Sequence, residues 1–213
     1  MNKADAGEES LEAKYAWTAW WYDLLDYPWE RQYRRWRPSL VGDLEGNVLE
    51  AGVGTGRNLE FYPASVNLTG IELSAAMLKK ARRRSRRARC AVSLVQEDAT
   101  LMTSLPSNHF DWIVSTFMCC VMPDELQPLA IAQFERVLKP GGRFRLLEMV
   151  FSADPTIRRR QERFAPFVEK VYGARFDRDT LAHLRRTPEL EVRNSYFLKQ
   201  DTYLVIEGVK TAV

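Results

Sequence analysis

The sequence contains few of the residues that build disulfide frameworks and metal centres. Its 213 residues include three cysteines and two histidines, and two of the cysteines, Cys119 and Cys120, are adjacent. No CxxC motif and no pair of histidines at metal-ligand spacing occurs. These absences exclude a disulfide-stapled scaffold and predict no metal site, and they are typical of a protein from a reducing, cytoplasmic compartment.

Long hydrophobic runs are also missing. No stretch approaches the ~20 consecutive apolar residues with which an α-helix spans a bilayer. The first residues, MNKADAGEESLEAK, are polar and acidic, unlike a secretory signal. We expect residues 1–13 to be a disordered tail and residues 14–213 to form a single cytoplasmic domain, with any membrane contact limited to the periphery of the inner face.

The positive charge of the chain is concentrated in one segment. The formal net charge is +3, yet residues 79–89, KKARRRSRRAR, hold eight basic side chains and no acidic one. The segment is either a solvated basic helix face or a docking surface for an anionic partner. No RNA-binding module is recognisable, so nucleic acid fits poorly. The partner that Lys79–Arg89 would fit is an anionic membrane surface.

From residue 47 onward, apolar runs typical of buried strands alternate with segments of helical periodicity. Strands are expected at residues 47–52, 66–73, 91–98, 110–118 and 142–150, and a helix at 128–138 ends at LKPGG. Two further apolar runs, 191–200 and 202–209, follow each other almost directly, which predicts an antiparallel pair. The pattern predicts an α/β fold with a doubly wound, mostly parallel, seven-stranded Rossmann-like sheet and an antiparallel C-terminal strand pair.

A stripe of large apolar residues precedes these strands. Trp17, Trp20, Trp21, Leu24 and Leu25 recur at helical spacing, and Pro28 limits the N-terminal aromatic helix that they predict. This helix either packs on the core or closes as a lid over a binding site, and the two interpretations are compatible.

A glycine-rich loop, GVGTG at residues 52–56, follows the first expected strand. Glycine lets the backbone turn sharply and approach a ligand closely, because no Cβ intervenes. A Walker loop would need GxxxxGK[ST], which is absent, and a dinucleotide loop would need GxGxxG, whereas here the spacing is GxGxG with Arg57 next. The structural alternative is a tight turn between a strand and a helix.

Three acidic residues lie near the ends of successive expected strands. Glu50 precedes the glycines, where its carboxylate could face a cationic group. Glu72 lies twenty residues past Gly52, the spacing of a carboxylate that accepts hydrogen bonds from ribose hydroxyls. Asp98 could accept from an adenine amine. Each acid alone is typical of a solvated strand end or a cap, but together beside GxGxG they predict a nucleoside-bearing ligand.

The chain resembles the class I S-adenosylmethionine-dependent methyltransferases in five motifs: VLEAGVGTG, GIELSAAML, QEDA, FDWIVSTF and RVLKPGG, over about residues 15–150. It looks most like the ubiquinone/menaquinone C-methyltransferase-like branch, which includes bacterial phospholipid N-methyltransferases and lipid-associated thiol methyltransferases. The resemblance implies S-adenosylmethionine as the cofactor and S-adenosylhomocysteine as its product. It also implies a helical lid at 14–46, a cofactor-binding core at 47–150 and an acceptor-specific helical region at 151–190.

The resemblance further implies a set of cofactor-binding residues. Glu72 would hold the ribose hydroxyls, Asp98 and Ala99 would hold the adenine edge, and Ser115 and Thr116 would face the reacting centre. The three glycines would line the methionine part, Glu50 would lie near its ammonium, and Tyr22 would close over the cofactor. The full set is Tyr22, Glu50, Ala51, Gly52, Gly54, Gly56, Asn58, Glu72, Leu73, Met77, Asp98, Ala99, Ser115 and Thr116.

The implied reaction needs little from the protein beyond positioning. A sulfonium methyl group is already electrophilic, so orientation supplies much of the acceleration, and a base is needed only for a protonated acceptor. The candidate catalytic residues are Tyr22 and Glu148, the latter as a base at the end of the fifth expected strand. We expect an enzyme that transfers a methyl group by in-line displacement to a small, apolar or lipid-like acceptor with an amine, thiol or ring-carbon nucleophile.

Two alternatives stay open at the level of sequence, which specifies no oligomeric state. A dinucleotide-dependent oxidoreductase would bind a nicotinamide cofactor, and the GxGxG spacing argues against it. A non-enzymatic binding module would keep the fold and dock on anionic lipid or nucleic acid through its basic helix, without turnover.

Overall fold

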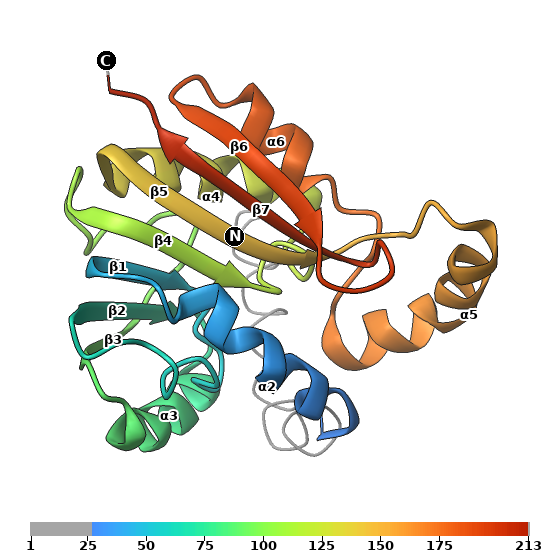
Figure 1. The fold of residues 1–213 in the computed structure, drawn as a ribbon, viewed down its shortest axis with the longest axis horizontal. Coiled ribbons are helices and arrows are strands. Elements are labelled where there is room, and N and C mark those ends of the chain that lie inside the picture. The colour runs from blue at the N-terminus through green and yellow to red at the C-terminus, as the bar shows by residue number, and fades with distance from the viewer. Residues whose placement is uncertain (1–26, 213) are drawn as a thin grey trace, which may run out of the picture.

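The computed structural model describes residues 27–212. The expected disordered tail, the aromatic helix around residues 17–25 and Tyr22 lie outside the described residues. The described chain forms one seven-stranded sheet in the order β3-β2-β1-β4-β5-β7-β6 (Figure 1). The strands are β1 (Gly46–Ala51), β2 (Val66–Glu72), β3 (Ala91–Gln96), β4 (Phe110–Thr116), β5 (Leu138–Met149), β6 (Leu190–Phe197) and β7 (Tyr203–Lys210).

Strand direction confirms the predicted doubly wound sheet. Strands β3, β2, β1, β4 and β5 are parallel, and β7 pairs antiparallel with both β5 and β6. The chain runs outward from β1 to β3 and then returns to β4 on the other side of β1. The carboxyl ends of β1 and β4 therefore flank the switch point at which open α/β sheets bind their ligands.

Both faces of the sheet are covered. The helices are α2 (Tyr27–Val41), α3 (Ala75–Arg84), α4 (Gln127–Val137), α5 (Pro155–Tyr172) and α6 (Thr180–Arg186), with short 3₁₀ turns η1 (Ser85–Arg87) and η2 (Asp124–Leu126). Leu40 of α2 and Ala81 of α3 belong to the core on one face, and Phe134 of α4 and Leu184 of α6 belong to the core on the other. Burial from both sides explains the near-continuous apolar runs in β1 and β4.

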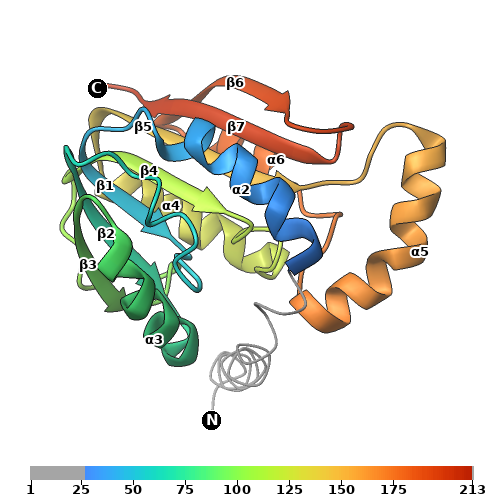
Figure 2. The ribbon, with the colours of Figure 1, turned by 60° about the horizontal axis from the view of Figure 1, so that its bottom comes forward.

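Local signals set the helix ends. Ser74 caps α3 by accepting a hydrogen bond from the Met77 amide at 3.4 Å, and serine is among the residues most favoured at this position. Asp154 caps α5 in the same way, and Gly173 ends that helix in the left-handed conformation at φ 72°. Helix α2 lies across one face of the sheet, whereas α5 projects beyond the sheet (Figure 2).

Two segments differ from the sequence prediction. Within the helical region expected at 151–190, Gly173 ends α5 before α6 begins, so the region contains two separate helices. Strand β5 begins at Leu138 rather than at Gly142, since Leu138 already pairs with Phe110 ahead of a bulge. Helix α2 begins at Tyr27, so Pro28 lies in its first turn, where proline is tolerated.

Candidate active site

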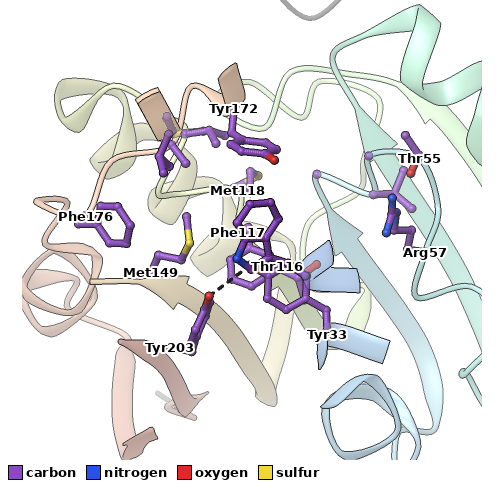
Figure 3. Close-up of a pocket in the computed structure, with 18 of the residues that line it drawn as sticks. Tyr33, Thr55, Arg57, Thr116, Phe117, Met118, Met149, Tyr172, Phe176 and Tyr203 are labelled. Carbon is purple, nitrogen blue, oxygen red and sulfur yellow. Dashed lines mark hydrogen bonds between the residues drawn. The ribbon is translucent and has the colours of Figure 1, made fainter. Parts of the chain in front are cut away.

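A large cavity opens at the carboxyl ends of the parallel strands. Its volume is about 1220 Å³, which exceeds the roughly 300–1,000 Å³ of typical small-molecule pockets. The cavity can therefore hold more than one small ligand. Figure 3 shows Thr55 and Arg57 on one side of it, Met149 and Phe176 on the other, and Phe117 between them.

The polar side of the cavity contains most of the residues that sequence analysis proposed for the cofactor. Ten of them line it: Glu50, Gly52, Gly54, Asn58, Glu72, Leu73, Met77, Asp98, Ala99 and Thr116. They come from the ends of β1, β2, β3 and β4 and from the first turn of α3. The topology brings these separate motifs to one edge of the sheet.

The glycines of the loop after β1 serve different purposes. Gly54 has φ +55°, and among the residues that the structure describes a Cβ there would meet only one atom, the Gly52 carbonyl oxygen, at 4.0 Å. Its backbone faces the open cavity, so a side chain would occupy ligand space. A Cβ on Gly56 would instead lie 2.9 Å from the Ala81 Cα. Gly56 permits close packing of the loop against α3 and does not line the cavity.

Glu72 braces the glycine loop. One carboxylate oxygen accepts from the Gly54 amide at 3.0 Å and the other accepts from the Ser74 amide at 2.9 Å. Burial raises the pKa of Glu72, and these backbone hydrogen bonds oppose the shift. The side chain thus joins the end of β2 to the loop while facing the cavity.

Glu50 lies at the centre of a buried polar network. It is 1% exposed and accepts hydrogen bonds from Asn58 Nδ2 at 2.7 Å and from the Tyr62 hydroxyl at 3.0 Å. Burial raises the pKa of Glu50 to about 7, against the lowering effect of these two donors and of Arg37. Arg37 of α2 donates to Asn58 Oδ1, so the network ties α2 to the glycine loop.

Asp98 uses only part of its hydrogen-bonding capacity within the protein. Its Oδ1 accepts from the Thr100 amide at 2.7 Å and from the Thr100 hydroxyl at 2.8 Å. Within residues 27–212, no hydrogen bond to Oδ2 is formed. This half-buried carboxylate lines the cavity with an oxygen available to a ligand.

The other side of the cavity is apolar and aromatic. Tyr33 of α2, Phe117 and Tyr203 form a ring cluster in which the Tyr33 and Phe117 centroids are 5.1 Å apart. The Tyr33 and Tyr203 hydroxyls lie 3.4 Å apart. Further apolar lining comes from the loop after β4, the end of β5 and helix α5: Met118, Val121, Met122, Met149, Ile157, Phe164, Phe167, Val168, Tyr172 and Phe176.

Four of the proposed residues lie away from the cavity lining. Ala51, Gly56, Ser115 and Glu148 do not line the cavity. Neighbouring residues in a strand point to opposite faces, so Thr116 lines the cavity and Ser115 lies fully buried behind it. The same alternation puts Met149 at the cavity and Glu148 in the core.

Glu148 is an anchor for the loop that follows β4. Its carboxylate accepts hydrogen bonds from the backbone amides of Cys119 at 3.1 Å and Cys120 at 2.7 Å. Burial raises the pKa of Glu148 to about 7. With both oxygens occupied and 2% exposure, it does not reach an acceptor in the cavity. Cys119 and Cys120 are themselves buried.

Several residues that shape the site were not among the predicted ones. Arg84 belongs to the basic segment at Lys79–Arg89, for which a solvated face and a docking surface were both open, yet its guanidinium donates to the Thr55 carbonyl at 2.7 Å and holds the glycine loop. Arg37, Tyr33 and Tyr203 come from distant elements, and no motif marks them. Only the position of Arg84 one turn after the buried Ala81 gave a local hint.

Two negative findings concern the described residues. Within them, no group of three or more His, Cys, Asp or Glu side chains could hold a metal ion. None of the helices formed by residues 27–212 is long and apolar enough to cross a membrane.

The sequence is similar to those of known methyltransferases. Residues 48–142 match the family model described as a methyltransferase domain. The chain is 34% identical to a phosphatidylethanolamine N-methyltransferase of Cereibacter sphaeroides over 51% of this chain and 53% of the relative. It is 30% identical to an uncharacterized methyltransferase of Anoxybacillus flavithermus over 68% of this chain and 69% of the relative.

A solved methyltransferase structure has the same fold. The crystal structure of the N-methyltransferase NodS from Bradyrhizobium japonicum WM9, in complex with S-adenosylhomocysteine, superposes with a TM-score of 0.62 at 20% identity, covering 86% of this chain and 87% of that one. The chain spans little more than half the length of the first curated relatives it matches, 53% and 58%. It belongs to the class I S-adenosylmethionine-dependent methyltransferases, in the ubiquinone/menaquinone C-methyltransferase-like branch that its motifs indicated.

Proposed function

We propose that the protein transfers a methyl group from S-adenosylmethionine to a small, apolar or lipid-like acceptor. The observation that carries this proposal is the division of one cavity of about 1220 Å³ into a polar side and an aromatic side. The polar side has groups suited to a nucleoside and an amino acid, and the aromatic side has few polar atoms. The two sides meet at Thr116 and Phe117.

The polar side fits the cofactor. The open space above Gly54 admits a ligand against bare backbone, and no side chain of residues 27–212 fills it. Glu72 faces the same space with a carboxylate already oriented by two backbone amides, as a ribose diol requires. Asp98 offers its Oδ2 to the adenine amine, and Leu73, Met77 and Ala99 supply apolar lining for the ring.

The bound cofactor would supply an electrophilic methyl group, and the chain would supply orientation and exclusion of water. The aromatic cluster of Tyr33, Phe117 and Tyr203 packs where the two sides of the cavity meet and keeps that region apolar. The paired Tyr33 and Tyr203 hydroxyls can hydrogen-bond a nucleophile and hold it in line. Glu148 takes no proton in this scheme, because its carboxylate faces the loop of Cys119 and Cys120.

The lipid-like character of the acceptor rests on two observations. The lining contributed by α5 and by the segment after β4 is largely aliphatic and aromatic, and its polar members are Glu125, Arg160 and Gln161. One relative that the chain resembles over half its length is a phosphatidylethanolamine N-methyltransferase. An acyl chain would lie along the apolar wall, and its headgroup amine would reach the tyrosine pair.

The decisive test is calorimetric titration with S-adenosylhomocysteine, using Gly54→Val and Gly141→Val. Both glycines have positive φ, +55° and +77°, so both substitutions strain the backbone, but Gly141 lies outside the cavity. We expect micromolar binding by the natural chain and by Gly141→Val, and none by Gly54→Val. Binding that survives in Gly54→Val would remove the glycine loop from the site.

Turnover is then measured with radiolabelled methyl donor and phosphatidylethanolamine in detergent micelles, with a hydrophobic thiol and a quinol in parallel. Product from any of these acceptors supports the proposal. Cofactor binding without turnover on all three would contradict the apolar acceptor, and NADH binding in place of S-adenosylhomocysteine would contradict the cofactor.

A further inference from the structure

Helix α5 is exposed to solvent, and its role in lining the cavity does not explain its exposed aromatic side chains. None of its 18 residues is buried, and it projects beyond the edge of the sheet (Figures 1 and 2). Phe164 and Phe167 are 60% and 51% exposed. Helices in water draw most of their stability from packing an apolar face, and Pro166 further weakens this one. Two large exposed rings on such a helix indicate a partner that covers them.

The polar surface of α5 specifies the charge of that partner. The helix carries five basic and two acidic side chains, a net charge of +3. Arg159, Arg163 and Lys170 recur at helical spacing along one edge of the apolar face, and all three are exposed. None of them forms an ion pair within residues 27–212. A row of unneutralised cations beside exposed aromatic rings is the composition of a helix that lies in the interface of an anionic bilayer.

We propose that α5 docks on the surface of an anionic phospholipid bilayer. Phe164 and Phe167 enter the boundary between headgroups and acyl chains, while Arg159, Arg163 and Lys170 contact lipid phosphates. Phe164 and Phe167 also line the mouth of the cavity, so docking brings that mouth to the bilayer. This proposal goes beyond the proposed methyl transfer, and it does not depend on the identity of the acceptor.

The basic segment at Lys79–Arg89 has basic side chains but no exposed apolar face beside them. The apolar residues of α3, Met77, Leu78 and Ala81, are buried against the core. Arg84 is used to hold Thr55. The segment presents charge without any large exposed apolar side chain, so it can strengthen attraction to an anionic surface but cannot insert into one. This difference makes α3 a matched control for α5.

The test is flotation of the full chain with phosphatidylcholine vesicles, with and without phosphatidylglycerol. Three double variants are compared: Arg159→Gln/Arg163→Gln and Phe164→Ser/Phe167→Ser in α5, and Arg82→Gln/Arg83→Gln in α3. Arg82 and Arg83 are exposed and do not line the cavity. Thermal unfolding of each variant establishes that it folds, and hydrogen exchange of the natural chain with vesicles locates the contact.

We expect the natural chain to float with anionic vesicles only, with binding that weakens as salt rises. Removing two charges from α5 should weaken partition by roughly 25-fold, on the basis of about fivefold for each basic residue at an anionic surface. The phenylalanine variant should weaken it by at least about tenfold, and the α3 variant by less than about twofold. Amides of residues 157–170 should gain protection.

Three results would overturn the proposal. If the natural chain floats with neither kind of vesicle, α5 is not a membrane-docking surface. Equal loss in the α3 and α5 charge variants would mean general attraction without a docking helix. A dimer that dissociates in Phe164→Ser/Phe167→Ser, seen by light scattering without vesicles, would identify a second copy of this chain as the partner that covers the two rings.

Discussion

Substituting Glu50 by glutamine should change how the stability of this protein depends on pH. Glu50 is fully buried, and its hydrogen bonds come from Asn58 and the Tyr62 hydroxyl. A glutamine can keep both contacts, because its oxygen accepts from Asn58 and its amide donates to the Tyr62 oxygen. The variant therefore removes a titrating group while preserving shape and hydrogen bonding.

The magnitude follows from the pKa of Glu50, which burial raises from 4.5 to about 7. Because the folded state holds its proton more tightly than the unfolded state, stability is greatest below the unfolded pKa and falls as the pH rises toward the folded one. The full loss is about 3 kcal/mol, since each unit of pKa corresponds to ~1.4 kcal/mol. Roughly 2 kcal/mol of it falls between pH 5.5 and pH 8.

The assay is urea unfolding of the natural chain and of Glu50→Gln at those two pH values. The difference between the two proteins cancels every other titrating group. Relative to the variant, the natural chain should lose roughly 2 kcal/mol on going to the higher pH, or about 1 M in midpoint for a slope near 2 kcal/mol/M. A difference that stays constant with pH would show that Glu50 keeps one protonation state in that range. A difference of opposite sign would show that Arg37 holds it as an anion.

Three further substitutions separate the roles of the other residues. Glu148→Gln should lower the free energy of unfolding by about 1–3 kcal/mol, because the glutamine side chain leaves one of the two backbone amides of the loop without an acceptor. The pH profile of turnover should keep its shape, and a flattened profile would restore Glu148 as a base. Asp98→Asn should leave thermal unfolding unchanged and weaken S-adenosylhomocysteine binding by roughly 10- to 100-fold in calorimetry, and unchanged affinity would exclude Asp98 from the adenine site. Arg84→Gln should weaken the same binding by loosening Thr55, whereas Arg83→Gln should not, and equal effects would refute the anchoring role.

The fold could be predicted from sequence because its signals are local. Buried parallel strands appear as apolar runs, and Ser74 marks the start of α3 as a cap. Glycine loops and strand-end acids follow those runs at fixed distances. Topology then brings the strand ends together, which is why ten of the predicted residues share one cavity.

Ser115 and Glu148 lie away from the cavity for one physical reason. Along a strand that is half exposed, hydrophobic and polar residues alternate, and the alternation identifies the face of each side chain. In β4 and β5 both faces are buried, so Ser115 and Thr116, or Glu148 and Met149, carry no sequence mark of the face each occupies. Strand register decides which side chain of each pair faces the cavity, and the sequence contains no local signal for that register.

Arg37 illustrates a second kind of limit. It lies 21 residues before Asn58, in a helix that precedes the first strand, and meets the glycine loop only because α2 crosses that face of the sheet. Such contacts join elements through tertiary packing. A glycine motif predicts where a ligand binds, but it does not identify the helix that holds the loop in place.

The strand-end acids differ in how the protein itself already uses them, and this difference decides which one reports on ligand binding. Both oxygens of Glu148 and both oxygens of Glu72 accept backbone amides, so substitution of either disturbs a loop before it affects a ligand. Glu50 is enclosed by side chains and contributes a pH-dependent stability term. Asp98 satisfies its local turn with one oxygen and faces the cavity with the other. Of these four acids, Asp98 is therefore the one whose substitution tests cofactor binding most directly.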